Sequence, residues 1–343
     1  MYVWSHRPRL ALPVLLSVQA LLVAVLLAGC GRSGQALEVY SGRGENLVGP
    51  LLDQFTEDSG IAVKVRYGDS ADLALLIAEE GRRTPADVFF SQSPGAVGFL
   101  SEGGLLAPLD QDLLDRVDPR FRNSGGRWVA VSGRQRVLVY NRDRVKEADL
   151  PESVFDLTGA SYAGKVAVAP QNASFQDFIT AMRQIKGDEA TLSWLTAMAR
   201  NRSPTYASNN AIVSAVARGE VPFGLVNHYY NFRFLAEDPS APTLNHAFSG
   251  GDVGGIVIVS SVAIPEPSGD KARARRLVEF LLSKKAQQYF RERTFEYPIA
   301  AGLEPDPRLP SLSSLEVLSY DFEGLGGGLK RTTELIARSG LQR

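Results

Sequence analysis

Two adjacent tyrosines, Tyr229 and Tyr230, directly follow the expected strand 223–226. Neighbouring side chains of a strand point to opposite faces, so the pair can reach one centre only where the strand has ended and the backbone turns. A free phenol has a pKa near about 10, so a trivalent ion could hold two phenolates at neutral pH and a weakly acidic metal could not. The pair therefore favours Fe³⁺, a hard cation suited to oxygen ligands. Packing is the alternative role for paired tyrosines.

Other chemistries find little support in the residues. The only cysteine is Cys30, and the histidines are His6, His228 and His246. That inventory excludes thiolate metal sites and histidine-rich ones. The motifs of hydrolases, P-loop proteins and zinc proteases are missing, so we expect no enzyme, and no motif supports a triad built on His228. Because 37 Lys+Arg face 38 Asp+Glu, we expect no nucleic-acid partner.

The start of the chain has the pattern of a secretory signal. Two arginines precede an apolar run over 10–27, and small residues close it. The closing sequence LAGC resembles a bacterial lipobox, in which the cysteine becomes the lipidated first residue. We therefore expect a signal peptide over 1–29 and a lipid anchor with a linker over 30–36, lipidated at Cys30; a permanent transmembrane helix is the alternative.

From residue 37 onward short strands alternate with amphipathic helices, which indicates an α/β fold with parallel pairing. Asn46 is expected to cap a helix that Gly60 ends, and a single long helix is expected over about 270–293. Long apolar strands near 128–140 and 255–265 would join two lobes. Ligands then bind between the lobes, at the carboxyl ends of the strands.

Over about residues 37–301 the sequence resembles the bacterial ferric-ion-binding proteins of ABC-type iron importers, also called bacterial transferrins. The resemblance implies a two-lobed periplasmic-binding-protein type II fold with a hinge of crossing strands. The expected N-lobe is 37–131 plus 262–310, and the expected C-lobe is 132–261 plus 311–343. The segments that carry the resemblance are VYSGR at 39–43, TPADVFF at 84–90, VSGRQRV at 131–137 and NHYY at 227–230.

The resemblance implies that Tyr229 and Tyr230 are iron ligands. Typical members add a histidine and a glutamate, but those places hold Gly44 and Gln92 here. Other members add a third tyrosine in the region matching 173–175, which is also absent. The first coordination shell is then the tyrosine pair completed by an exogenous anion or water. Less favoured recruits, as ligands or as supporting residues, are Tyr40, Glu45 and Gln92.

Charge counting favours a synergistic anion. Fe³⁺ with two phenolates leaves one positive charge, and carbonate or phosphate would need a cationic or amide-rich cradle. Arg43, near the carboxyl end of the first strand, is the first candidate; a surface arginine in a turn is the alternative. Arg134 and Arg136 are expected to pair with carboxylates, although one could face the ligand. Family analogy adds an anion pocket of Ser93, Asn172, Ala173, Ser174, Asn209 and Asn227.

These observations predict a monomeric extracytoplasmic binding protein for Fe³⁺. Lobe closure would bury the ion, and docking on an ABC permease would release it. The expected location is the periplasm or the outer face of the cell membrane, with the lipid on Cys30 as anchor. Two alternatives stay open: a binding protein for an organic cation such as thiamine or a polyamine, and a hydrolase or sensor on the same fold.

Overall fold

The computed structural model describes residues 1–2, 35–248, 250–300, 302–312 and 325–342. Cys30 and nearly all of the expected signal peptide lie outside these residues. The chain from Leu37 onward forms one compact unit. Within the described ranges, no helix combines the length and the apolar character needed to cross a membrane.

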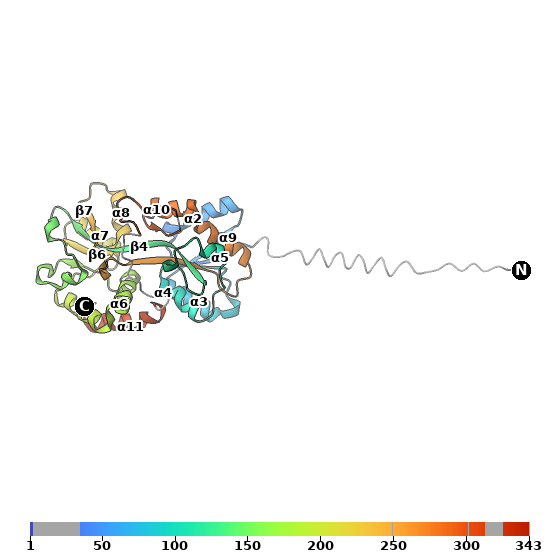
Figure 1. Ribbon diagram of the computed structural model, residues 1–343, viewed down its shortest axis with the longest axis horizontal. Helices are drawn as coiled ribbons and strands as arrows, with labels where there is room; N and C mark the ends of the chain where they lie inside the picture. The colour runs from blue at the N-terminus through green and yellow to red at the C-terminus, as the bar shows by residue number, and fades with distance from the viewer. Residues whose placement is uncertain (3–34, 249, 301, 313–324, 343) are drawn as a thin grey trace. The chain divides into compact units, whose positions relative to one another are not determined.

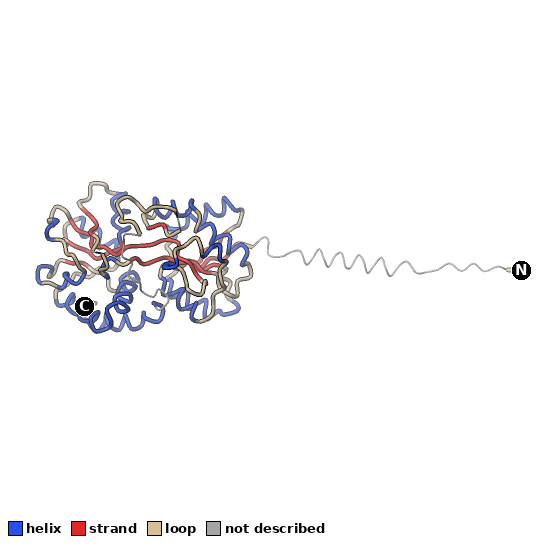
Figure 2. The backbone as a smooth tube through the Cα atoms, viewed as in Figure 1, coloured by secondary structure: helices blue, strands red, loops and turns tan. Residues whose placement is uncertain are grey.

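The described strands form one sheet with helices on both sides (Figure 2). Its order is β2-β1-β3-β8-β4-β6-β5, and β7 and β9 also pair with β4. β1 runs parallel to β2 and β3, and β5 runs parallel to β6, whereas β8 is antiparallel to its neighbours. The strands are β1 (Leu37–Ser41), β2 (Val63–Tyr67), β3 (Val88–Ser91), β4 (Trp128–Asn141), β5 (Val166–Ala167), β6 (Phe223–Asn227), β7 (Thr243–His246), β8 (Val257–Ala263) and β9 (Tyr297–Pro298).

Helices connect and cover these strands, as the alternating sequence pattern predicts. The α-helices are α2 (Glu45–Ser59), α3 (Ser70–Glu80), α4 (Pro94–Glu102), α5 (Gln111–Leu114), α6 (Ala173–Arg200), α7 (Asn209–Ala217), α8 (His228–Glu237), α9 (Lys271–Leu281), α10 (Lys284–Glu292) and α11 (Leu325–Ser339). Short 3₁₀ turns occupy Gly81–Arg83, Pro119–Phe121, Glu147–Asp149, Val154–Thr158, Ala160–Tyr162 and Val253–Gly255.

Two helix predictions were wrong in detail. The single helix expected over 270–293 is two helices, because the Ser283 side chain accepts a hydrogen bond from the backbone N–H of Ala286 and starts α10 as its N-cap. Gly44, in an extended conformation, caps α2 in place of Asn46. The predicted end of α2 at Gly60 is confirmed, since this glycine has the positive φ of 71° that ends many helices.

Strands β4 and β8 run through both halves of the sheet (Figure 1). They pair from Trp128 opposite Ala263 to Gln135 opposite Val257, with a shift of register between Ala130 and Ser132. A shift of this kind bends a strand and increases its twist. The lobe boundary expected at 131/132 lies at this shift and the one at 261/262 lies one residue beyond it; both stay a prediction.

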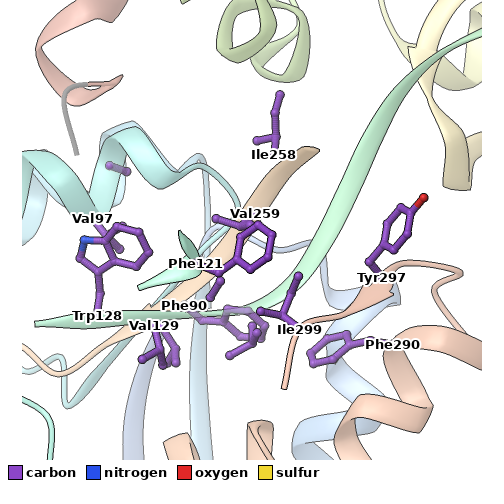
Figure 3. Packing of buried hydrophobic residues seen from close by; sticks show 14 of the residues in the cluster. Phe90, Val97, Phe121, Trp128, Val129, Ile258, Val259, Phe290, Tyr297 and Ile299 are labelled. Atoms are coloured by element: carbon purple, nitrogen blue, oxygen red, sulfur yellow. The ribbon is translucent and has the colours of Figure 1, made fainter. Parts of the chain in front are cut away.

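The hydrophobic core gathers where β3, β4 and β8 meet (Figure 3). Phe90, Trp128 and Val259 are fully buried there, and burial of each such side chain contributes about 1.5–3 kcal/mol. Close packing also explains a glycine of the VSGR motif. A Cβ on Gly133 would stand 3.1 Å from the Ile299 side chain, so only glycine fits without a shift of its neighbours.

Candidate metal-binding site

Tyr229 and Tyr230 lie in the first turn of α8, directly after β6. The backbone turns at Asn227, the N-cap, and the two rings stack with centroids 4.2 Å apart and planes 28° apart. The structure therefore brings the pair together at a strand end. The N-terminus of a helix also favours negative charge, which suits phenolates.

Burial dominates the electrostatics of Tyr229, whose side chain is 1% exposed. Desolvation raises the pKa of this phenol well above its ordinary value, and the neighbouring Tyr230 raises it further. Arg43 and Arg134 act in the opposite direction because their positive charges favour the phenolate. The phenol of Tyr229 is therefore neutral at pH 7 until a ligand of high positive charge displaces its proton.

His228 is committed to the backbone. Its Nδ1 accepts from the N–H of Gln135 (3.0 Å), and its Nε2 lies 2.6 Å from the carbonyl of Phe295, which fixes the tautomer protonated at Nε2. Burial lowers the pKa of His228 to about 4. A neutral ring with both nitrogens engaged offers no free base, so the geometry gives no support to a triad on His228.

Three fully buried arginines lie around the tyrosines: Arg43, Arg134 and Arg136. The alternative of a surface position for Arg43 is excluded, because its side chain is fully buried. Its Nη2 pairs with Oε2 of the buried Glu296 at 2.6 Å, and its Nη1 donates to Ser260 Oγ at 3.2 Å. In each of the three arginines, Nε has no hydrogen-bond partner among the described residues.

Arg134 and Arg136 do not pair with carboxylates within the described part of the chain, contrary to expectation. Arg134 donates to Ser260 Oγ (2.7 Å) and to the carbonyl of Gln92. Arg136 donates to the carbonyl of Leu225 (2.7 Å). Arg134 and Arg136 are two positions apart on β4, so their side chains leave the strand on the same face. The hydrogen-bond acceptors within reach on that face are hydroxyl and carbonyl oxygens.

The charge of Arg136 is coupled to the tyrosines. Burial lowers the pKa of its guanidinium to about 9, while Tyr230, Asp177 and Tyr229 each oppose that shift. The guanidinium also lies over the ring of Phe178, 5.4 Å from its centroid. Arg136 can therefore stabilise negative charge on the phenols or on an anion beside them.

Three residues of the expected anion pocket form one hydrogen-bonded group, and Arg136, which donates to Ser174 Oγ at 3.5 Å, links a fourth, Asn227, to it. Asn172 caps α6, and its Oδ1 accepts from Ser174 Oγ (2.6 Å) and from Asn209 Nδ2 (3.1 Å). Asn227 Oδ1 accepts from Arg136 Nη1 at 3.3 Å, which joins the group to the arginines. Asn209 Oδ1 and Asn227 Nδ2 have no partner among the described residues, so one acceptor and one donor are free for a ligand. Ala173 is exposed at the start of α6.

The turn after β3 holds Gln92 and Ser93. Ser93 Oγ donates to Asp177 Oδ1 at 2.7 Å, and the N–H of Gln92 donates to Ser70 Oγ. Asp177 and Glu296 were missed at the level of sequence. Their one signal is an acidic side chain in a segment rich in apolar residues, 175–182 for Asp177 and 295–300 for Glu296.

Tyr40 and Glu45 are not brought to the tyrosine pair by any contact in the structure. The Tyr40 hydroxyl donates to Glu80 Oε1 at 3.1 Å, and Arg66 lies over its ring. Glu45 is exposed at the first position of α2. The described residues also contain no cluster of three or more His, Cys, Asp and Glu fit to hold a metal. A metal here would therefore depend on phenols and exogenous oxygens.

Comparison with known proteins places these features in a family. Residues 83–323 match the family of bacterial extracellular solute-binding proteins. An Fe(3+)-binding periplasmic protein of Serratia marcescens is 32% identical, over 96% of this chain and 97% of that protein.

Two solved structures have the same fold. Iron-bound HitA of Pseudomonas aeruginosa gives a TM-score of 0.83 at 31% identity, covering 89% of this chain and 99% of that one. IdiA (FutA) of Trichodesmium, in complex with iron and citrate ligands, gives 0.77 at 27% identity, covering 89% and 99%. The expected two-lobed α/β fold is confirmed. This chain belongs to the bacterial extracellular solute-binding proteins, among the ferric-ion-binding members of that family.

Proposed function

We propose that this protein captures Fe³⁺ outside the cytoplasm and delivers it to an ABC permease. The observation that carries the proposal is the stacked pair Tyr229 and Tyr230 at the start of α8, beside three buried arginines. Two phenolates are hard oxygen ligands of the kind Fe³⁺ prefers, and thiolates are missing. The names of the Serratia and Pseudomonas relatives agree with iron as the cargo.

An exogenous anion completes the iron shell in this proposal. Fe³⁺ and two phenolates leave a charge of +1, and the free N–H groups of Asn227 and the three arginines are suited to an oxyanion. Arg136 is the better cationic partner, because Glu296 already neutralises Arg43. Carbonate and phosphate are the candidates, and the citrate of the Trichodesmium complex makes a carboxylate a third.

Capture uses the two predicted lobes, 37–131 plus 262–310 and 132–261 plus 311–343. Iron and the anion bind first to the tyrosine side, and bending of β4 and β8 then closes the second lobe over them. The protein acts as a monomer without catalysis, held at the periplasmic or outer face of the membrane through lipid on Cys30.

The surroundings of the tyrosines disfavour the two alternative functions. Thiamine or a polyamine would bring positive charge close to Arg134 and Arg136 without displacing the phenol protons, whereas two phenolates and an anion offset the charge of Fe³⁺. A hydrolase needs an activated nucleophile, and His228 has both ring nitrogens bonded to the backbone.

Ferric citrate added to the purified protein tests the proposal. Iron phenolates should give a visible charge-transfer band, and the Tyr229→Phe, Tyr230→Phe double variant should lack it. Tyr162→Phe is the matched control, because the Tyr162 hydroxyl donates only to the carbonyl of Asp149. A wild type without the band, or a double variant with the full band, would exclude iron binding by this pair.

A further inference from the structure

One side-chain hydrogen bond joins distant parts of the sheet. Ser93 follows β3, whereas Asp177 lies on α6, which follows β5. β3 and β5 are separated in the sheet by β8, β4 and β6. Ser93 Oγ donates to Asp177 Oδ1 at 2.7 Å, so this contact connects the two halves that β4 and β8 join.

Both ends of this contact are held firmly. Ser93 is the N-cap residue of α4, its carbonyl accepts from Ser91 Oγ (2.6 Å), and its N–H donates to the same oxygen (3.2 Å). The neighbouring Gln92 carbonyl accepts from Arg134. Asp177 is one turn beyond Ser174 on α6, a helix capped by Asn172. The hydroxyl and the carboxylate therefore meet because two well-anchored elements meet.

The negative charge of Asp177 strengthens its contact with Ser93. Asp177 is partly buried, and a carboxylate partly withdrawn from water is costly unless partners compensate it; the positive charges of Arg134 and Arg136 attract its negative charge. Its one direct hydrogen bond within the described residues comes from Ser93. Separation of the two halves would remove that bond and leave the carboxylate to water and the arginines.

The C-terminal helix does not duplicate this link. α11 packs against both α4 and α6 (Figure 1). Its hydrogen bonds to other described helices are all with α6. The hydroxyls of Thr332 and Thr180 bond to each other at 2.7 Å, and Arg183 Nη1 donates to the carbonyl of Gly328 at 2.7 Å. The Ser93 bond is therefore the direct polar tie between the α4 turn and α6.

We propose that Asp177 is a positioning residue for ligand capture: its carboxylate fastens the turn at Ser93 to α6 when the two halves close, and so slows release of the bound ligand. The inference rests on the proposed function, because closure over iron is what the tie would hold. Asp177 acts on the closed geometry and contributes no atom to the iron shell.

Release kinetics test the tie. Ser93→Ala removes the donor, Asp177→Asn keeps an acceptor oxygen but removes the charge, and Ser93→Thr restores a hydroxyl. Each iron-loaded protein is mixed with excess chelator, and loss of the charge-transfer band gives the release rate. A hydrogen bond to a charged group corresponds to about 10-fold or more in rate, so Ser93→Ala and Asp177→Asn should release iron at least about 10-fold faster.

The double variant Ser93→Ala, Asp177→Asn should release iron no faster than the faster single variant, since both changes act on the same contact. Ser93→Thr should stay near the wild-type rate. Asp188→Asn is the matched control, because Asp188 lies on α6 just beyond the break at Gly187, where φ is 84°, but pairs with Arg183 and Arg331. The wavelength of the band should not change in Asp177→Asn or in Asp188→Asn.

Several outcomes would overturn the inference. If Ser93→Ala and Asp177→Asn both release iron at a rate within about twofold of wild type, the contact does not hold the closed form and the inference is wrong. A changed band wavelength in Asp177→Asn would make Asp177 a ligand instead. If wild type gives no band, the proposed function fails independently of the contact. Small-angle scattering of the ligand-free proteins then tests the contact itself. A larger radius of gyration for Ser93→Ala than for wild type supports it, and an unchanged radius contradicts it.

Discussion

Iron capture by two phenolates predicts how strongly affinity depends on pH. The Tyr229 phenol is neutral at pH 7, because burial raises its pKa well above the ordinary value of about 10. Iron binding must therefore release one proton for each tyrosine ligand. Each released proton strengthens apparent binding about 10-fold per pH unit, or about 1.4 kcal/mol. Two tyrosine ligands together give about 100-fold per pH unit.

Removal of one phenol should reduce this slope by one. Tyr229→Phe and Tyr230→Phe should each bind iron more weakly and lose one power of ten per pH unit relative to wild type. The assay is competition with citrate at roughly pH 6 to 8, followed through the charge-transfer band. Protonation of citrate and hydrolysis of iron affect all variants equally, so they cancel in the comparison.

Equal slopes for wild type and both single variants would refute the reasoning, since the ligands would then not be ionised phenols. A reduced slope in Tyr230→Phe alone would show that Tyr229 serves only for packing. Tyr162→Phe should keep the wild-type slope, because the Tyr162 hydroxyl donates to the backbone carbonyl of Asp149 and is not part of the proposed iron site.

Three further predictions concern stability. The pKa of His228 falls from 6.5 to about 4 on folding, so the unfolded chain takes up a proton at a higher pH than the folded one. The free energy of unfolding in urea should therefore be fully retained above about pH 6.5 and fall by about 3 kcal/mol towards pH 4. His228→Gln should largely abolish this pH dependence. Arg43→Met leaves Glu296 charged and buried, so urea unfolding should show a loss of about 3–5 kcal/mol, and Arg43→Met with Glu296→Leu should recover much of it; no recovery would contradict the pairing. In Gly224→Ala the new methyl would lie 2.2 Å from the Ile212 side chain, so thermal unfolding should show a loss of about 1–3 kcal/mol, and an unchanged melting temperature would mean that α7 moves freely.

The position of Tyr229 and Tyr230 is readable from sequence because a local rule decides it. Side chains alternate along a strand, so two adjacent tyrosines act together only beyond its end, and the structure starts α8 there. The buried face of α2 follows from spacing in the same way: apolar residues recur at helical spacing, and the members of that set are all buried, namely Leu47, Val48, Leu51, Leu52 and Phe55.

Contacts between distant segments could not be read in this way. Glu296 is 253 residues from Arg43, and Asp177 is 84 residues from Ser93. Nothing local distinguishes such a carboxylate from one in solvent. Tyr40 shows the converse: its place near the end of β1 suggested a ligand, but its hydroxyl turns to Glu80 on α3. Strand periodicity does not say which neighbour a side chain meets.

The shared strand β8 makes the folding of the two halves interdependent. β8 pairs with β3 through Ser261–Ala263 and with β4 through Val257–Ala263, so neither half has its full sheet until the chain has passed residue 263. Contacts between segments so far apart in sequence form slowly. A chain that emerges N-terminus first from its site of synthesis would therefore stay incompletely folded until residue 263 has emerged.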